Sequence, residues 1–316
     1  NIMAWTYSPN GITDQNLSND TIAISTVGCV LVLNGTYDIA GGNNDFSVLS
    51  DAINALNSCG VSGPVVLRLA PGIYNSLSSI SGTYFNTNEI NTVTFTSLSG
   101  IADSVTIGTA TGIALTLSDA KYLHFKNISI GNSNTTYGVY FQNANEHITF
   151  YGCNIKANPT TTSSSTAAVC YLNTNGSTNY LKNIMFIKNN IDGGYYNFYM
   201  NYPAGSNNNM GATGMSVIID SNNLTNAYIY GIYSYYYGRY PSISYNTITS
   251  RNSGSVSSSW YGISINLFHN VDFMVGNKIK STNTSISSPY GIYISQYYNY
   301  TSYSGSGAGL IANNEI

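Results

Sequence analysis

Short stretches of alternating apolar and polar residues recur along the chain, each followed by an asparagine and then an aliphatic residue. The clearest copies are "FIKNNI" (186–191), "IIDSNNL" (218–224), "SISYNTI" (242–248), "FMVGNKI" (273–279) and "LIANNEI" (310–316), with earlier relatives "HFKNISI" (124–130) and "TFYGCNI" (149–155). A period of two predicts β-strands with one buried face. Because asparagine tolerates left-handed backbone geometry, each copy predicts a strand that ends in a turn.

A second motif, built on Tyr-Gly-Ile-Tyr, lies between the copies of the first. It reads "YGVYF" (137–141), "YGIYS" (230–234), "YGISI" (261–265) and "YGIYI" (290–294), with weaker copies "SGTYF" (81–85), "TGIAL" (111–115), "AAVCY" (167–171) and "YNFYM" (196–200). Successive copies stand 26 to 34 residues apart. Short strands repeated at this period, without a helical pattern, predict a β-solenoid in which each coil stacks on the next.

The predicted solenoid has about eight coils of roughly 30 residues, and at a strand spacing of about 4.8 Å it would be on the order of 40 Å long. Asparagines at equivalent turns would lie above one another and hydrogen-bond from coil to coil. The residues of this expected ladder are Asn189, Asn222, Asn246, Asn277 and Asn314. An ordinary β-sandwich is the alternative fold.

The N-terminal part follows a different pattern. In "NDFSVLSDAINALNSCG" (44–60) the apolar residues that share one helical face are Phe46, Leu49, Ile53 and Leu56. Asp45 is expected to cap the start of this helix and Gly60 its end. Since an exposed coil end invites edge-to-edge association, we expect the helix to cover the end of the solenoid. The expected divisions are residues 1–35, strands of a preceding module or a further cap; 36–75, a cap with a helix near 45–58 and a first strand; and 76–316, coils that are cut short at the C-terminus.

Composition narrows the possible partners. Only 7% of the 316 residues are charged and the net charge is −3, so neither nucleic acid nor an anionic membrane surface has electrostatic support as a partner. The chain has no run of about 20 apolar residues, which argues against membrane insertion. Tyrosine is over-used, with 29 residues. Low charge suits a solenoid, because like charges at stacked positions would repel.

The run "GTYDIAGGNNDFSVLSDAINALNSCGVSGPVVLRLAPGIYN" (35–75), followed by Asn-rich coils, resembles a known class of module. These are the right-handed parallel β-helix modules of very large secreted surface proteins, typical of bacteria that use the type IX secretion route, including gliding adhesins. The coils are similar to those of the pectate-lyase-like fold. The resemblance implies a right-handed parallel β-helix with an N-terminal capping helix, in an extracellular, cell-attached protein that is part of a longer chain. It does not identify a ligand.

Many β-helix proteins cleave polysaccharides, so the acidic residues of the coils are candidates for catalysis. Glycoside hydrolysis needs two carboxylates across one bond. The acids of the expected coils are scattered, with no two adjacent in sequence: Glu89, Asp103, Asp119, Glu146, Asp192, Asp220, Asp272 and Glu315. The Asp-Asp, Gly-His-Gly and Arg-x-Lys motifs of polygalacturonase-like enzymes are absent. We therefore expect no catalytic residues.

The histidines and arginines give little further indication of a catalytic or binding site. His124, His147 and His269 each stand near the start of an Asn-motif strand, which we interpret as one recurring structural position. Glu146 beside His147 is the best acid–base pair that the chain offers. Arg239 and Arg251 are interpreted as exposed loop charges, with recognition of an acidic sugar as the alternative.

The four cysteines, Cys29, Cys59, Cys153 and Cys170, lack metal-binding spacing. Two disulfides, no disulfide and burial as small apolar side chains all stay open. We expect no metal and no cofactor.

Strand alternation places one column of tyrosines on the outside of the coils. In "GIYI" Ile292 and Ile294 point inward and Tyr293 outward, and the same register gives Tyr84, Ala114, Tyr140, Cys170, Tyr199, Tyr233 and Ser264. Glycine precedes most of these positions and is expected to leave open space beside each ring. The segment "YGIYSYYYGRY" (230–240) adds further tyrosines to this pattern. The candidate ligand-binding residues are Tyr140, Tyr199, Tyr233, Tyr235, Tyr236, Tyr237, Arg239, Tyr240 and Tyr293.

Tyrosine combines ring area with a polar tip, which suits binding of uncharged sugars or proteins. Stacked rings would also stabilise neighbouring coils, so a purely structural role stays open. The sequence favours a non-catalytic segment of a large bacterial cell-surface protein that acts as an adhesin or rigid spacer. Its expected partners are surface glycans or other cell-surface and secretion proteins. The alternatives are a polysaccharide lyase or glycoside hydrolase of the same fold, and a phage or viral fibre domain.

Overall fold

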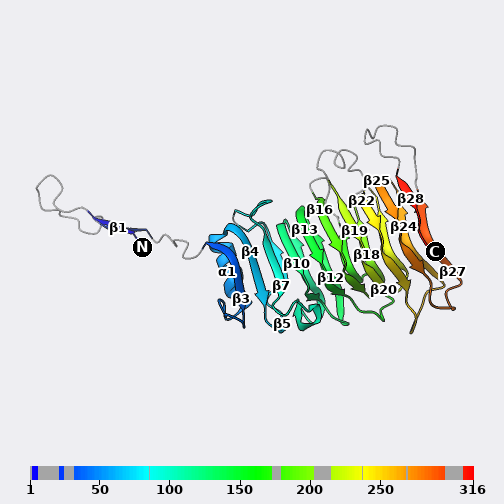
Figure 1. The fold of residues 1–316 in the computed structure, drawn as a ribbon, viewed down its shortest axis with the longest axis horizontal. Helices are drawn as coiled ribbons and strands as arrows, with labels where there is room; N and C mark the ends of the chain where they lie inside the picture. The colour runs from blue at the N-terminus through cyan, green and yellow to red at the C-terminus, as the bar shows by residue number, and fades with distance from the viewer. Residues whose placement is uncertain are drawn as a thin grey trace, which may run out of the picture.

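The chain forms a right-handed parallel β-helix, as predicted (Figure 1). The computed structural model describes residues 2–5, 21–24, 32–84, 86–172, 179–202, 215–236, 238–267, 270–295 and 309–316. Within these residues three parallel sheets run side by side along the solenoid, and each coil contributes one strand to each sheet in turn.

The first sheet has ten strands in the described part of the chain: β3 (Leu33–Ile39), β4 (Val61–Leu69), β7 (Val93–Ser97), β10 (Lys121–Lys126), β13 (Asn145–Tyr151), β16 (Leu181–Ile187), β19 (Val217–Asp220), β22 (Arg239–Ser244), β25 (Asn270–Val275) and β28 (Leu310–Ala312). The second has eight short strands: β5 (Gly72–Tyr74), β8 (Val105–Ile107), β11 (Ser129–Ile130), β14 (Asn154–Lys156), β17 (Asn190–Asp192), β20 (Asn223–Ala227), β23 (Thr247–Ser250) and β26 (Lys278–Lys280).

The third sheet also has eight described strands: β6 (Ser79–Ser81), β9 (Gly112–Ser118), β12 (Thr135–Gln142), β15 (Ala167–Leu172), β18 (Tyr196–Asn201), β21 (Tyr230–Tyr235), β24 (Ser259–Asn266) and β27 (Ser288–Ser295). These strands carry the Tyr-Gly-Ile-Tyr motif, while the Asn motif joins the first sheet to the second. The eight strands agree with the predicted number of coils.

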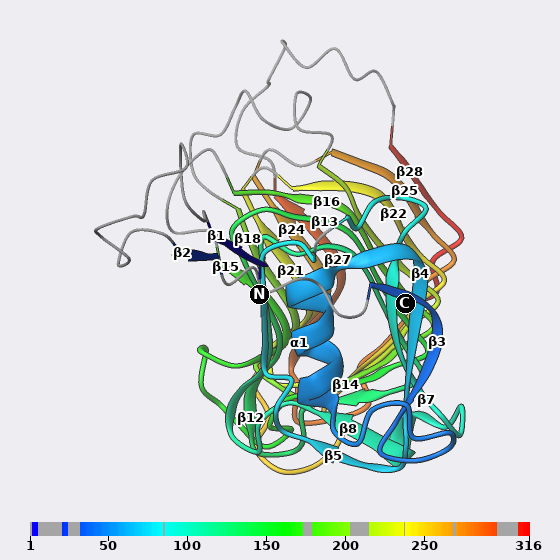
Figure 2. The ribbon, with the colours of Figure 1, turned by 90° about the vertical axis from the view of Figure 1, so that its left-hand side faces the viewer.

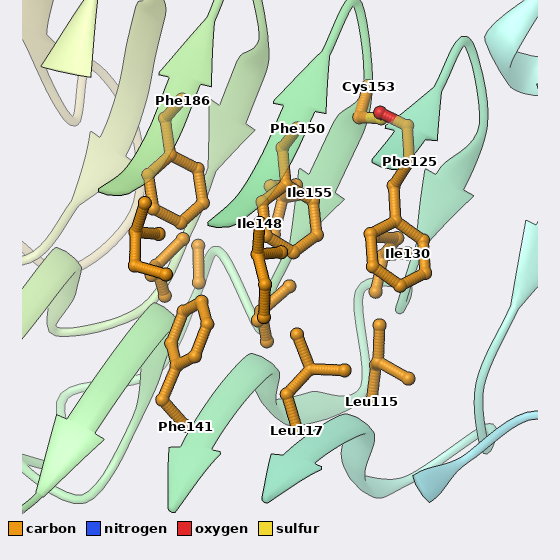
Figure 3. Close-up of a cluster of buried hydrophobic side chains, with 14 of the residues drawn as sticks. Leu115, Leu117, Phe125, Ile130, Phe141, Ile148, Phe150, Cys153, Ile155 and Phe186 are labelled. Carbon is orange, nitrogen blue, oxygen red and sulfur yellow. The ribbon is translucent and has the colours of Figure 1, made fainter. Parts of the chain in front are cut away.

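Inward side chains fill the solenoid with a continuous apolar core (Figure 3). Phe125, Phe150 and Phe186 lie at matching positions of β10, β13 and β16, with ring centroids 5.0 and 4.9 Å apart and nearly parallel planes. Phe141 of the third sheet meets Phe150 and Phe186 edge-on. Each such ring is fully buried, which stabilises the fold by roughly 2–3 kcal/mol.

The five motif asparagines hydrogen-bond to one another in order along the turn between the first and second sheets. The Oδ1 of each later asparagine accepts from the backbone N–H of the earlier one, as in the 2.9 Å bond between Asn189 and Asn222. Each side-chain amide also donates to a backbone carbonyl of the preceding coil, such as Phe150 O for Asn189. Cys153 occupies the preceding rung, where its backbone N–H donates to Asn189 Oδ1 at 2.9 Å.

Helix α1 (Leu49–Cys59) lies across the N-terminal end of the solenoid (Figure 2). Its buried residues, Leu49, Ala52, Leu56 and Cys59, face the first coils. It ends at Gly60, as expected, but Asp45 is not its cap: the residue before the helix is Val48, which makes no side-chain capping bond. The Asp45 carboxylate instead accepts from the Asp38 backbone N–H at 2.7 Å. Strand β3 begins at Leu33 and pairs in parallel with β4.

Other described elements are few. Strands β1 (Ile2–Trp5) and β2 (Thr21–Ile24) pair antiparallel with each other. A short 3₁₀ helix, η2 (Ala102–Ser104), precedes β8.

The register of the first coils differs from the sequence alignment. Tyr140 of β12 pairs with Thr116 rather than Ala114, and Thr116 pairs with Ser79 rather than Tyr84. Ala114 and Tyr84 are both buried. A β-bulge between Thr135 and Tyr137 changes the register by one residue within β12, and the spacing of the repeats alone does not reveal the observed pairing.

From β12 onward the motif glycines are close approaches rather than open spaces, whereas Gly82 and Gly112 of the first coils have open space around them. A Cβ on Gly262 would lie 2.2 Å from Cγ2 of Ile279 and 2.7 Å from the carbonyl oxygen of Gly291. Gly231 and Gly291 are equally confined. The expectation of open space beside each tyrosine is therefore wrong: glycine is needed because second-sheet isoleucines pack against the third-sheet backbone.

Candidate functional site

Two rows of tyrosines run along the outer face of the third sheet. The central row contains Tyr140, Tyr199, Tyr233 and Tyr293, interrupted by Cys170 and Ser264, and strand pairing aligns these six residues coil by coil. The leading row contains Tyr137, Tyr196, Tyr230, Tyr261 and Tyr290, which stand one residue before the motif glycine or, for Tyr196, before Asn197. We refer to the two together as the tyrosine face.

Rings of the leading row stack on one another from coil to coil. Successive centroids from Tyr196 through Tyr230 and Tyr261 to Tyr290 are 5.3, 5.0 and 4.6 Å apart, with interplanar angles of 9°, 19° and 5°. Rings of the two rows also contact one another, as Tyr196 and Tyr199 do at 4.3 Å. The rings of the two rows from Tyr137 to Tyr233, with Ala167 and Cys170, form an apolar cluster separate from the main core. Ring faces are thus largely used within the rows, and this leaves ring edges and hydroxyls for solvent.

The tyrosine face is uncharged. None of the third-sheet strands described contains Asp, Glu, Lys or Arg. Burial, and secondarily neighbouring tyrosines, raises the pKa of Tyr230 to about 12 and that of Tyr196 and Tyr233 further, so these hydroxyls are neutral at physiological pH. Among the residues of the tyrosine face, the exposed fraction is greatest in β27, where Tyr290 and Tyr293 are 41% and 40% exposed.

Amide side chains border the central row on the same face. They occupy the position two residues after the central row. This position holds Gln142 in β12 and Leu172 in β15, and then Asn201, Tyr235 and Asn266 in the next three strands, which pair in register. Tyr235 and Tyr236 lie ring edge to ring face, with centroids 4.1 Å apart. The face therefore combines tyrosine hydroxyls with amide donors and acceptors.

The remaining candidates near residue 240 do not all join this face. Tyr240 is fully buried in the core, where its hydroxyl lies 2.7 Å from that of Ser234, so it is not a surface residue. Its strand β22 belongs to the first sheet, and so does Arg239, which forms a 2.6 Å ion pair with Asp272. Tyr237 lies outside the described residues. The described part of the predicted cluster is thus divided at a coil corner, and Tyr235 and Tyr236 are its described members next to the tyrosine face.

Arg251 is not an exposed loop charge. It is 2% exposed, and its guanidinium donates to the carbonyl oxygens of Thr161, Gly194, Asn226 and Ser255 at 3.0–3.3 Å. Its guanidinium carbon also lies 5.3 Å from the ring centroid of Tyr228. Arg251 joins loops of several coils and has a structural role.

Glu146 and His147 do not form an acid–base pair. Glu146 accepts from Lys121 at 2.9 Å and from the Tyr180 hydroxyl at 2.5 Å. Burial alone would raise the pKa of Glu146, but these two hydrogen bonds outweigh it and hold the pKa below its ordinary value. His147 instead stacks on Tyr122, with centroids 4.7 Å apart.

The histidines also do not share one structural position. His124 pairs in register with Thr149, two residues beyond His147, and His269 lies outside the described residues. His124 and His147 nevertheless line one hollow on the outer face of the first sheet. Sequence reasoning missed this hollow. It treated the histidines as one recurring position, and this concealed the two-residue offset in strand register that places both imidazoles beside the hollow.

Several other acids have structural partners. Asp38 pairs with Arg68, Asp192 accepts from Thr225 and Asn226, and Asp220 accepts from Ser242.

Among the described cysteines, Cys59 is disulfide-bonded, whereas Cys153 and Cys170 are free and buried. Burial raises the pKa of the Cys153 thiol to about 12, so it is protonated and unreactive.

Comparison with protein-family models, with curated proteins and with solved structures finds no match. In the described part of the chain, no helix has both the length and the apolar character needed to cross a membrane.

Proposed function

We propose that this chain is a non-catalytic segment of an extracellular, cell-attached bacterial surface protein, which holds neutral glycans on its tyrosine face while its coils act as a rigid spacer. The observation that carries the proposal is the tyrosine face itself: an uncharged sheet surface on which tyrosine recurs coil after coil. The central row from β12 to β27 would extend for roughly 24 Å at the spacing of parallel strands.

The chemistry of this face suits uncharged sugars. A sugar offers hydroxyls that can hydrogen-bond with phenolic hydroxyls, and apolar C–H patches that can pack against the exposed ring area, at little conformational cost to the protein. Asn201 and Asn266 would add amide donors and acceptors beside the rings. Because the face lacks charged side chains, it favours a neutral glycan over an acidic one.

Two further observations support an extracellular, structural role. The disulfide at Cys59 is typical of oxidising compartments outside the cytosol. Several acidic residues that might have served catalysis hold backbone or cationic groups instead, as Asp38, Glu146 and Asp272 do. We place the chain with the very large surface proteins of the type IX secretion route, including gliding adhesins, on the strength of its cap and coils.

The proposal is tested by retention of the protein on immobilised neutral polysaccharides. Replacing both Tyr233 and Tyr293 by alanine should weaken retention by roughly 10-fold or more, as expected when anchoring rings are truncated. Tyr151→Ala is the matched control, because Tyr151 is 37% exposed but lies on the first sheet. Urea unfolding of each variant would show that the coils are intact.

Equal retention of the wild-type and the double variant, with both folded, would remove the tyrosine face as the attachment site. Equal loss in Tyr151→Ala would show that exposed aromatic area in general, rather than this face, causes retention.

A further inference from the structure

The first sheet carries a hollow of about 300 Å³ on its outer face, away from the tyrosine face. Residues at successive rungs of the sheet form its base: His124 of β10, Thr149 of β13, Met185 of β16 and Ile218 of β19. The size is at the lower end of the range for small-molecule sites in proteins.

Thr149 lies in this hollow with an unsatisfied hydroxyl. The residue is 8% exposed, and its Oγ1 has no hydrogen-bond partner among the described residues. Burial of an unpaired hydroxyl is costly, and such groups are rare in folded proteins. A ligand hydroxyl seated in the hollow would give Thr149 the missing partner.

His124 supplies a second set of polar atoms. Burial, and secondarily the charge of Lys126, lowers the pKa of His124, so the imidazole is neutral at neutral pH. A neutral imidazole offers one donor and one acceptor. No hydrogen bond to this ring occurs within the described residues, so both nitrogens are available to a ligand.

One wall of the hollow is a stack of three side chains. Tyr122, His147 and Asn183 occupy matching left-handed positions, with φ of 59°, 55° and 54°. The rings of Tyr122 and His147 are stacked, and Asn183 Nδ2 lies 3.4 and 3.3 Å from the two ring nitrogens of His147. These near-equal distances place the amide over the ring, so the wall is held in one arrangement.

Charge limits what the hollow can accept. The carboxylate of exposed Glu89 lines it and nearby Lys126 carries the opposite charge, so the two groups together favour an ion of neither sign. Met185 and Ile218 add apolar surface. The lining therefore matches a neutral molecule with several hydroxyls and an apolar ring face.

The geometry points to a second carbohydrate site: we propose that this hollow binds a single neutral sugar unit, with hydrogen bonds to the Thr149 hydroxyl and the His124 imidazole. The site is separate from the tyrosine face and goes beyond the proposed function, because it accepts one sugar ring rather than an extended chain.

Saturation-transfer NMR on the whole chain at neutral pH tests the site. The probes are glucose, galactose, mannose and N-acetylglucosamine, with glucuronate as the anionic comparison. At least one neutral sugar should bind, and glucuronate should bind more weakly. Thr149→Val keeps the shape of the side chain and removes the hydroxyl, so it should weaken sugar binding roughly 3- to 10-fold, the effect of one lost hydrogen bond.

Thr149→Val should at the same time leave the ligand-free protein as stable or more stable in urea, because it removes an unpaired buried hydroxyl. His124→Phe keeps a ring in place and should also weaken binding. Thr96→Val, on β7 but not in the lining of the hollow, is the matched control and should bind as the wild-type does.

The inference is overturned if none of the four neutral sugars binds, or if Thr149→Val and His124→Phe bind as tightly as the wild-type. The tyrosine face is tested independently: Tyr293→Ala should leave the NMR signal unchanged, and Thr149→Val should leave retention on polysaccharide unchanged. Failure of one proposal can therefore be told from failure of the other.

Discussion

Asn222 shows how a single side chain joins several coils. Its Nδ2 donates to the Phe186 carbonyl at 2.9 Å and to Asn246 Oδ1 at 3.0 Å, and its Oδ1 accepts from both nitrogens of Asn189 at 2.9 Å. The residue is 2% exposed. All its hydrogen-bonding capacity is used inside the protein, where an unmet group is most costly.

Asn222→Ala should therefore destabilise the fold by roughly 2–5 kcal/mol, since it leaves at least two buried backbone groups unpaired. Its neighbour Asn223 is exposed, so Asn223→Ala should change stability by no more than about 0.5 kcal/mol. Urea unfolding followed by circular dichroism compares the two. Similar losses in both variants would contradict the ladder as a source of stability.

Sequence reasoning could find the ladder residues because each lies in a short local pattern, an alternating strand followed by Asn and an aliphatic residue. It could not place Tyr240, because burial at a coil corner depends on which sheet the next strand joins. The burial of Arg251 could not be predicted for a similar reason, because three of the carbonyl groups that accept its hydrogen bonds come from segments distant in sequence.

At the scale of elements, strand register determines what the tyrosines do. Pairing of Tyr230 with Tyr196 and Tyr261 brings their rings to stacking distance. Alternation along each strand was enough to predict an outer tyrosine column from β12 onward. It failed in the first coils, where Tyr140 pairs with Thr116, two residues away from the partner that the alignment of the repeats gives.

The stacked rows should make stability depend on pH in the alkaline range. The pKa of Tyr230 is raised from 10.0 to about 12 in the folded protein, mainly by burial and then by Tyr261. Folding is thus favoured below pH 10, where the unfolded tyrosine is also neutral, and the advantage is lost as pH rises from 10 to 12, because the unfolded tyrosine ionises first.

Urea unfolding midpoints measured across this range should be level below pH 10 and fall above it. Tyr230→Phe keeps the ring and removes one ionising group, so its midpoint should fall less steeply. A midpoint that stays constant up to pH 12, or an unchanged slope in Tyr230→Phe, would show that burial in the rows does not suppress ionisation.

At the scale of the whole molecule, the faces of the solenoid differ in chemistry. Strands of the first sheet carry Arg68, Lys121, Lys126, Lys182 and Arg239, whereas the third sheet carries no charge in its described strands. Helix α1 covers the N-terminal end (Figure 2). The repeat period predicted the architecture, but the hollow on the first sheet could not be predicted, since it depends on side chains of four successive strands and of the segment before β7.

The central claim is that this solenoid binds glycans without cleaving them. Incubation with a panel of neutral and acidic polysaccharides tests it most directly, when bound polymer and released reducing or unsaturated ends are measured in the same samples. The account predicts that neutral polymers are bound and that the number of ends does not rise above a protein-free control. Release of new ends that is abolished by Asp or Glu substitution would contradict the account and identify an enzyme.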